Sequence, residues 1–305
     1  MVSLNEYRFL SSNGRDEIRV YEWRPETEPV AVLQLHHGVS EHIMRYNDFA
    51  RFLASKGVFV VGHDCAGHGH SAHEGTRLNF GNGGWNVVVE DFKTIYDRYS
   101  KLYAGKPYFA LGHSMGSFVL RTFISRFPGK LTGTILSGTG FKDSAITSAG
   151  KMVANAVCAI KGELHVSNLV NGLALGAYNN GLGEKGGYDW LSCNKESNDK
   201  YIADPWCGGI PTVGLYRDMF TGLAEVCSKE CADKMDKETP VLLISGAADP
   251  VGDKGEGVYK VANLFKESGV KNVKTLLYPG MRHEVLNEKN KQEAYDMVLR
   301  FVLGK

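Results

Sequence analysis

PYFALGHSMGSFVLRTFISRF, residues 107–127, places an apolar run, a serine between two glycines and a helix-compatible run in direct succession. This order predicts a strand, a sharp turn and a helix, with Ser114 at the apex of the turn. Gly112 and Gly116 allow the strand and the helix to approach each other closely. Such a turn projects the Ser114 hydroxyl above the sheet edge and aims the Met115 amide at negative charge developing nearby. The five-residue pattern also arises by chance, so a serine in an ordinary strand–helix turn is the alternative.

Working outward from this stretch, apolar runs of strand length alternate with segments of helical periodicity. Residues 5–24 alternate with a period of two around Asn13-Gly14, which predicts an antiparallel pair at a sheet edge. The fold class is therefore α/β, with a mostly parallel eight-stranded sheet flanked by helices. The other strands are expected at 30–35, 57–63, 108–111, 131–136, 241–245 and 273–278, and the helices at 41–56, 86–104, 253–268 and 288–303.

The texture of the sequence changes after the sixth strand. Residues 141–237 are rich in Gly, Asn, Ser and Ala and contain no β-branched run of strand length. They predict short helices at 145–161, 166–176 and 211–235, with a loop at 179–200. An insertion at this point lies over the carboxyl edge of the sheet, so we interpret it as a helical cap, or lid. The core is then formed by residues 1–140 and 238–305.

Bulk properties exclude several classes of protein. A chain of 305 residues with 43% hydrophobic and 23% charged residues is typical of a globular protein with a sizeable core. Its formal net charge of +1 gives no electrostatic reason to expect a nucleic-acid partner. The N-terminus has no apolar signal region and no apolar stretch is long enough to span a bilayer, so a cytoplasmic location is expected. Nothing in the sequence indicates the oligomeric state.

Neither the cysteines nor the histidines follow a metal-ligand pattern. The six cysteines are scattered, and the four histidines between positions 63 and 73 are separated by glycines that give no rigid ligand face. We interpret the segment that contains these four histidines as a glycine-rich loop held by hydrogen bonds from Asp64, His68 and Ser71. No metal site and no cofactor are therefore expected.

Two further residues follow apolar strands in the order needed for nucleophilic catalysis. Asp249 comes just after the strand at 241–245, and His283 comes after the last strand. The order Ser114…Asp249…His283 is that of the α/β-hydrolase triad. His283 would take the proton of Ser114, and Asp249 would orient the imidazole and stabilise its charged form.

The loop after the strand at 30–35 supplies a candidate oxyanion donor. Its amide at Val39 would hold the tetrahedral oxyanion together with the amide of Met115. The alternative is that Gly38 only turns the chain and that the neighbouring histidines are ordinary polar loop residues.

Taken together, these segments resemble the monoacylglycerol lipase and lysophospholipase family of α/β-hydrolases, often grouped with serine aminopeptidase-type lipases. The matching pieces cover nearly the whole core. The resemblance implies Ser114 as nucleophile, Asp249 as acid, His283 as base and a helical cap over an acyl pocket. The pieces are His37-Gly38-Val39-Ser40-Glu41-His42 with Arg45-Tyr46, Asp64 with Gly67-His68-Gly69 and Ser71, Gly112-His113-Ser114-Met115-Gly116, Asp249-Pro250-Val251 and the His283 loop.

The expected activity is hydrolysis of carboxylic esters of single-chain lipids, monoacylglycerols or lysophospholipids, through an acyl-enzyme on Ser114. A transient contact of the cap with a membrane surface is a further option, although its polar face lacks a Lys/Arg-rich stripe. The alternatives are a general carboxylesterase or peptidase-like acyl hydrolase of small substrates, and a non-catalytic binding protein on the same fold. The absence of a His-Gly-Gly-Pro loop disfavours proline iminopeptidases. Ser114 disfavours epoxide hydrolases, which need a carboxylate at this turn.

Overall fold

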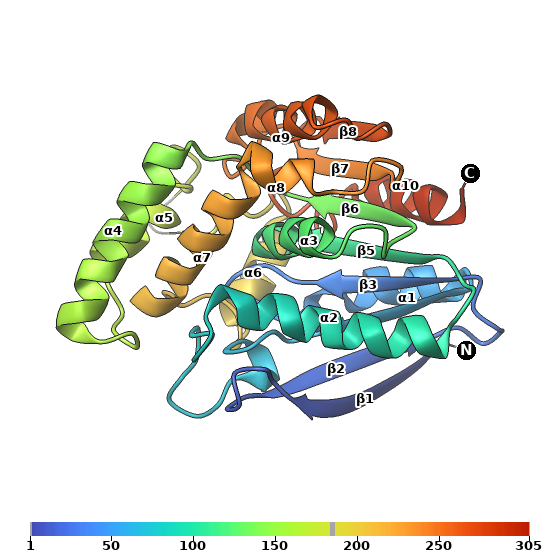
Figure 1. Cartoon of the computed structure of the whole chain (residues 1–305), viewed down its shortest axis with the longest axis horizontal. Helices are drawn as coiled ribbons and strands as arrows, with labels where there is room; N and C mark the ends of the chain where they lie inside the picture. The colour runs from blue at the N-terminus through green and yellow to red at the C-terminus, as the bar shows by residue number, and fades with distance from the viewer. Residues whose placement is uncertain (1, 184–186, 305) are drawn as a thin grey trace.

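The computed structural model of the protein describes residues 2–183 and 187–304. Over these residues, eight strands form one sheet (Figure 1). They are β1 (Ser3–Leu10), β2 (Glu17–Arg24), β3 (Ala31–His36), β4 (Val58–His63), β5 (Tyr108–His113), β6 (Gly133–Ser137), β7 (Val241–Gly246) and β8 (Val273–Tyr278). Their order across the sheet is β1-β2-β4-β3-β5-β6-β7-β8.

The direction of the strands agrees with the expectation from the sequence. β1 pairs with β2, and β2 with β4, in antiparallel fashion, whereas the pairs from β4 to β8 are parallel. β3, β4, β5, β6 and β7 are buried along their whole length, as their uninterrupted apolar runs predict. The parallel strands end at one edge of the sheet, so the loops that follow β3, β5, β7 and β8 meet there.

Helices cover both faces of the sheet (Figure 1). α2, α3 and α9 share one apolar cluster with the first face, and α1 and α10 share another with the opposite face. The predicted helix at 41–56 begins as a short 3₁₀ turn, η1 (Ile43–Tyr46), and the one at 253–268 begins as η3 (Asp253–Gly255). The bounds are α1 (Asn47–Ser55), α2 (Trp85–Leu102), α3 (Met115–Arg126), α9 (Glu256–Glu267) and α10 (Lys291–Leu303).

The segment between β6 and β7 is helical and lies beyond the carboxyl edge of the sheet (Figure 1). α4 packs along α7, and α7 packs on α3 of the core, whereas α8 contacts α3 and α9. No helix among the described residues is both long and apolar enough to cross a membrane. The helices are α4 (Ser144–Lys161), α5 (Asn168–Ala174), α6 (Lys195–Ala203), α7 (Val213–Val226) and α8 (Lys229–Asp233).

Two details of this segment differ from the prediction. The expected loop at 179–200 contains the start of α6, whose sequence KESNDKYIA buries only Asn198 and Tyr201. So few buried positions leave no apolar periodicity for sequence reasoning to detect. The expected helix at 211–235 is two helices, because Ser228 ends the first run and caps the second by accepting a hydrogen bond from the amide of Cys231.

The glycine-rich loop after β4 is held as predicted, by side chains. Asp64 accepts hydrogen bonds from the amides of Ile43 (2.9 Å) and His70 (2.8 Å), and Ser71 donates to the Asp64 carbonyl (2.6 Å). The His68 ring lies 3.0 Å from the Ala66 carbonyl. A short 3₁₀ turn, η2 (Gly69–Ser71), ends the loop.

Several histidines near the carboxyl edge are buried as neutral rings. Burial lowers the pKa of His36 and of His68 to about 4, and it holds the pKa of His63 well below its ordinary value. The rings of His36 and His63 meet edge-on, with centroids 5.0 Å apart. Neither ring nitrogen of His63 has a hydrogen-bond partner among the described residues. Charging any of these rings inside the fold is therefore costly.

Acidification should destabilise the protein through these rings. A histidine in the unfolded chain has a pKa of about 6.5. Between that pH and about pH 4 the unfolded chain therefore binds more protons than the folded protein, so the free energy of unfolding falls as the pH is lowered. We expect His63→Phe, which keeps a ring of similar size, to remove up to about 1.4 kcal/mol per pH unit of this dependence. Urea titrations at pH values above and below the histidine range measure the slope. Exposed His73→Phe is the control, and an unchanged slope in His63→Phe would contradict the prediction.

Candidate active site

Ser114 stands at the strained turn that the sequence predicts. Its φ of 51° and ψ of −119° lie in a region that L-residues avoid. The flanking glycines are required by close packing: a Cβ at Gly112 would lie 2.2 Å from the Gly116 carbonyl oxygen, and one at Gly116 would lie 2.4 Å from the His36 carbonyl oxygen. The turn at Ser114 therefore packs closely against both the start of α3 and the end of β3.

Asp249 and His283 are brought together from different loops. Nδ1 of His283 lies 3.0 Å from Oδ2 of Asp249, and both side chains are buried. Asp249 also accepts hydrogen bonds from Ser245 Oγ (3.0 Å) and from the Val251 amide (2.8 Å), which fix its orientation. The bond to Asp249 leaves Nε2 of His283 as the nitrogen available to Ser114, and both residues line the same cavity.

Two cavities meet at Ser114. One, of about 310 Å³, is lined by polar and aromatic groups that include Glu41, His283 and Tyr201. The other, of about 70 Å³, is mainly apolar and extends beneath α4, α5 and α7. Val39 and Met115 line this second cavity beside Ser114. Both predicted oxyanion donors therefore come from residues that line the same cavity as Ser114.

A buried ion network links the Val39 loop to the His283 loop. Arg45 donates to both oxygens of Glu284 and to Oε2 of Glu41, each at 2.6 Å. Oε1 of Glu41 in turn accepts from the Gly38 amide (2.6 Å) and from the Tyr46 hydroxyl (2.8 Å). The loop that carries Val39 is therefore fixed through Glu41, and the residue after His283 is fixed through Arg45.

The electrostatics distinguish His283 from its neighbours. Burial disfavours the charged imidazole, but the charge and hydrogen bond of Asp249 outweigh burial and raise the pKa of His283. The pKa of His113, whose ring centroid is 4.6 Å from that of His283, is lowered by burial to about 4. Burial of Glu284 is likewise outweighed by Arg45, and its pKa falls to about 2. Of these two neighbouring rings, His283 is therefore the one whose surroundings favour the protonated form.

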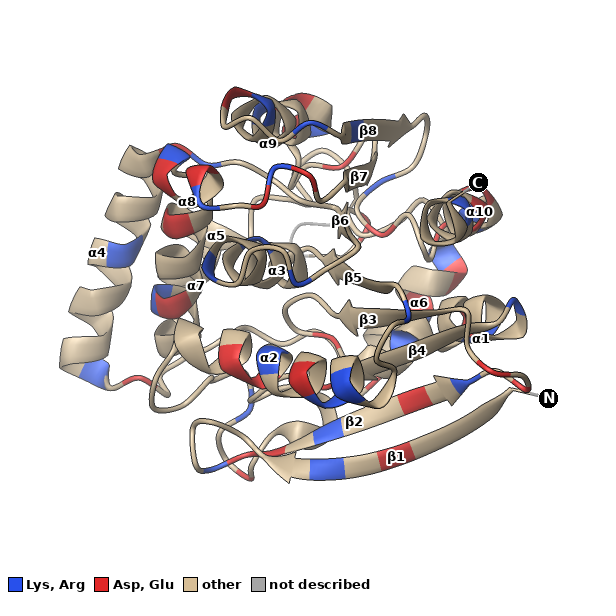
Figure 2. Ribbon diagram, turned by 45° about the vertical axis from the view of Figure 1, so that its right-hand side comes forward, with Lys and Arg blue, Asp and Glu red and all other residues tan. Residues whose placement is uncertain are grey.

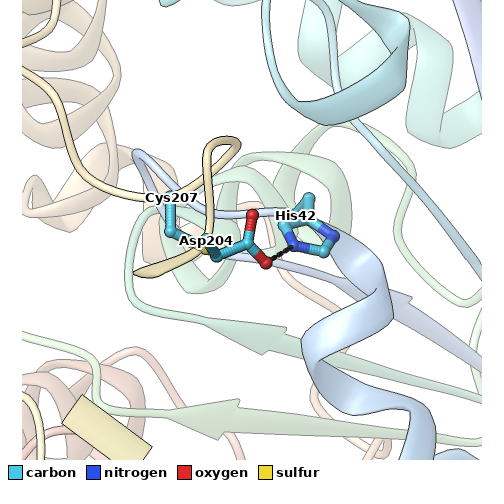
Figure 3. A group of neighbouring side chains, drawn as sticks. All are labelled: His42, Asp204 and Cys207. Atoms are coloured by element: carbon cyan, nitrogen blue, oxygen red, sulfur yellow. Dashed lines mark hydrogen bonds and ion pairs between the residues drawn. The ribbon is translucent and has the colours of Figure 1, made fainter. Parts of the chain in front are cut away.

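His42, Asp204 and Cys207 form a compact group of metal-ligand types at the boundary between the core and the helical segment (Figure 3). The figure shows Nε2 of His42 directed at Asp204, and these atoms are 2.9 Å apart. Burial raises the pKa of the Cys207 thiol, and the Arg45 cation lies near enough to act on that thiol. A neighbouring cation and a protonated thiol both oppose metal binding. We interpret the group as a contact between the β3 loop and the segment after α6.

Comparisons with known proteins agree with this geometry. The serine aminopeptidase S33 family matches residues 27–290. The chain belongs to this family. It is 29% identical to a monoacylglycerol lipase of Mycolicibacterium smegmatis, over 93% of this chain and 92% of the relative. It is 31% identical to human monoglyceride lipase, over 87% and 79% respectively.

Solved structures agree as well. A thermostable carboxyl esterase from Bacillus coagulans, solved with glycerol, superposes on the chain with a TM-score of 0.92 at 28% identity, covering 100% of this chain and 99% of the esterase. The fold class and the family resemblance expected from the sequence are therefore confirmed. The roles given to Ser114, Asp249, His283, Val39 and Met115 stay predictions that rest on where these residues lie.

Sequence reasoning missed the residues that support this site. Ser245 precedes Asp249 by four residues and bonds to it, and Glu284 directly follows His283. Trp190, which comes from the predicted loop, places its ring 5.1 Å from that of His283. A carboxylate beside the base was visible in the sequence, but its partner Arg45 lies 239 positions away and could be found only by folding the chain.

Removing Arg45 should destabilise the protein strongly. Arg45→Met leaves the buried carboxylates Glu41 and Glu284 without a counter-charge, and we expect the free energy of unfolding to drop by about 3–5 kcal/mol. Urea unfolding at neutral pH measures this loss. The control is Lys195→Met, which breaks an exposed pair with Asp199 and should change little. An Arg45→Met protein as stable as the wild type would show that the network is not needed for the fold.

Proposed function

We propose that the protein is a serine hydrolase that cleaves carboxylic esters of single-chain lipids, monoacylglycerols or lysophospholipids, through an acyl-enzyme on Ser114. The observation that carries this proposal is the Asp249–His283 hydrogen bond in a cavity that Ser114 shares. Family membership and the named lipase relatives support the same reaction. The proposed reaction needs no metal or organic cofactor, because every proton transfer can be made by His283.

The reaction proceeds in two halves. His283 takes the Ser114 proton as the hydroxyl attacks the ester carbonyl, and the Val39 and Met115 amides hold the oxyanion of the tetrahedral intermediate. His283 then gives this proton to the departing alcohol, which leaves the acyl group on Ser114. In the second half, His283 takes a proton from a water molecule as that water attacks the acyl-enzyme. It then returns the proton to Ser114 as the carboxylic acid leaves. Asp249 stabilises the imidazolium in both halves, in keeping with the raised pKa of His283.

The two cavities support a division of the substrate. The more apolar cavity suits the acyl chain, and the larger cavity, which mixes apolar side chains with polar groups such as Glu41 and Asn171, suits the alcohol. At about 70 Å³ the apolar cavity is much smaller than a long acyl chain. Its lining includes Ile146 and Leu173, each 56% exposed, so a longer chain would pass between α4 and α5 towards the surface. We propose that residues 141–237 act in this way as the acyl-binding cap.

Loss of the nucleophile gives the most direct test. Ser114→Ala should lower hydrolysis of p-nitrophenyl esters by at least about 10³-fold and abolish labelling by a fluorophosphonate probe. Ser144→Ala, an exposed serine at the start of α4, should match the wild type in both assays. Full activity in Ser114→Ala would sink the proposal. Absence of both activity and labelling in the wild type would favour the non-catalytic alternative.

A general carboxylesterase of small substrates is the second candidate. The small apolar cavity favours it, and so does the likeness to the Bacillus coagulans carboxyl esterase. A series of p-nitrophenyl esters of increasing acyl length separates the two. A maximum at the shortest chains would identify a general esterase, whereas a rise towards longer chains would support the lipid substrate.

The outer face of the cap supports contact with a lipid surface. Ile146, Met152 and Ile160 on α4, with Leu169 and Leu173 on α5, are more than half exposed. α4 carries lysines and no acidic residue, and Figure 2 shows it tan with blue bands. An apolar face with cationic neighbours suits the boundary of a bilayer. The cytoplasmic location expected from the sequence stays a prediction.

Weakening this face should affect only substrates presented in membranes. We expect Met152→Ser with Ile160→Ser to lower hydrolysis of monoacylglycerol in anionic vesicles by at least about five-fold, because less apolar surface enters the bilayer. Hydrolysis of dissolved p-nitrophenyl butyrate should be unchanged, since neither residue lines a cavity at Ser114. Ile202→Ser on α6 is the control for an exposed isoleucine elsewhere. Equal losses on both substrates would argue against membrane contact.

A further inference from the structure

The loop that carries His283 is bonded to a short piece of the cap segment, residues 189–194, which we call the strap. Arg282 Nη1 donates to the Asp189 carbonyl (2.5 Å), and the Glu284 amide donates to the Leu191 carbonyl (2.7 Å). Asn194 Nδ2 donates to the Asn287 carbonyl (3.1 Å). The strap also carries Trp190, whose ring faces that of His283. The position of the strap therefore bears on the position of the imidazole.

Glu288 is a buried residue that bonds to both the strap and the His283 loop. Its Oε1 accepts hydrogen bonds from the Arg282 amide (2.8 Å) and from the Cys193 amide (3.0 Å), and its Oε2 lies 3.1 Å from the same Cys193 nitrogen. The residue is 2% exposed. One carboxylate thus joins the peptide just before His283 to the backbone of the strap.

An ordinary helix cap does not explain Glu288. α10 begins at Lys291 with Asn290 as its N-cap, and the Asn290 side chain makes no capping hydrogen bond. A buried carboxylate is costly unless its bonds repay the lost hydration. The hydrogen bonds of the Glu288 carboxylate go to the two segments that flank the imidazole, and not to the amides of α10.

We propose that Glu288 is a positioning residue for His283: it clamps the base loop to the strap so that the imidazole keeps its bond to Asp249 and stays in reach of Ser114. This inference rests on the proposed function, because it takes His283 as the base. The base is then held on both sides, by Glu288 through Arg282 and by Arg45 through Glu284. The strap is then part of the framework that positions the base.

The test compares Glu288→Ala with Glu288→Gln, which keeps the oxygen that accepts from both amides. We expect Glu288→Ala to lower kcat for p-nitrophenyl esters by about 10- to 100-fold, as a small displacement of a catalytic group does, with KM little changed. The pKa that defines the acidic limb of its kcat/KM–pH profile should fall towards the ordinary histidine pKa, because His283 loses part of its contact with Asp249. Glu288→Gln should retain most of the activity and the wild-type limb.

The matched control is Glu196→Ala, which removes the same charge from the same surface groove but pairs with Lys200 on its own helix. Amide hydrogen exchange of the peptides covering 189–194 and 280–286 measures, independently of activity, whether the strap and the His283 loop stay bonded to each other. Faster exchange in Glu288→Ala, and not in Glu196→Ala, is expected. Should Glu288→Ala not fold, Glu288→Asp, which withdraws the carboxylate by one methylene, takes its place with the same expected direction.

The outcomes separate the two proposals. An active, probe-labelled wild type together with wild-type kcat, pH limb and exchange in Glu288→Ala overturns the role of Glu288 and leaves the proposed function intact. An inactive, unlabelled wild type overturns the proposed function, and the exchange comparison still decides whether Glu288 clamps the two segments. Equal losses of kcat in the alanine and glutamine variants would also count against the clamp.

Discussion

The buried guanidinium of Arg45 is the contact on which the arrangement of the site depends. It pairs with Glu41 on the Val39 side and with Glu284 on the His283 side, and it lies 4.7 Å from the centre of the Tyr201 ring of α6. The two loops follow β3 and β8, which lie on opposite sides of the β5–β7 strands. The sheet brings the carboxyl ends of β3 and β8 to one edge, but it does not determine the conformation of the loop that follows each strand.

A buried charge of this kind is not mainly a source of stability. Its attraction to two carboxylates is offset by the cost of removing three charged groups from water. What it supplies is geometry, because both oxygens of Glu284 and one of Glu41 must face a single planar group. Tyr201 connects α6 to the same loop, since its hydroxyl donates to the Ser40 carbonyl next to Val39 (2.8 Å).

The sequence was sufficient to predict the sheet, and it nominated candidate site residues, but it did not reveal the contacts that orient them. Uninterrupted apolar runs report full burial wherever they occur, so the strands from β3 to β7 could be found one by one. Ser114 directly follows β5, Asp249 comes three residues after β7, and His283 comes five residues after β8, so each could be nominated from its place after a strand. α6 escaped detection because its nine residues bury only two side chains. Arg45 was noticed only as part of a matching motif and Glu288 was not noticed, because the role of a polar residue depends on the distant group that it contacts.

The pKa pattern shows how the fold singles out one histidine among several. His113 and His283 are both buried, and their rings lie 4.6 Å apart, yet burial lowers the pKa of the first to about 4 while the pKa of the second is raised. The difference is a carboxylate in contact: His283 meets Asp249, whereas His113 meets the hydroxyl of Ser137 at 3.3 Å. Environments that push two neighbouring pKa values apart assign one ring to proton transfer and leave the other as neutral packing. In the proposed mechanism, the loop after β8 can carry the base only as long as it holds that ring against Asp249, and Glu284 and Glu288 anchor this loop to Arg45 and to residues 189–194.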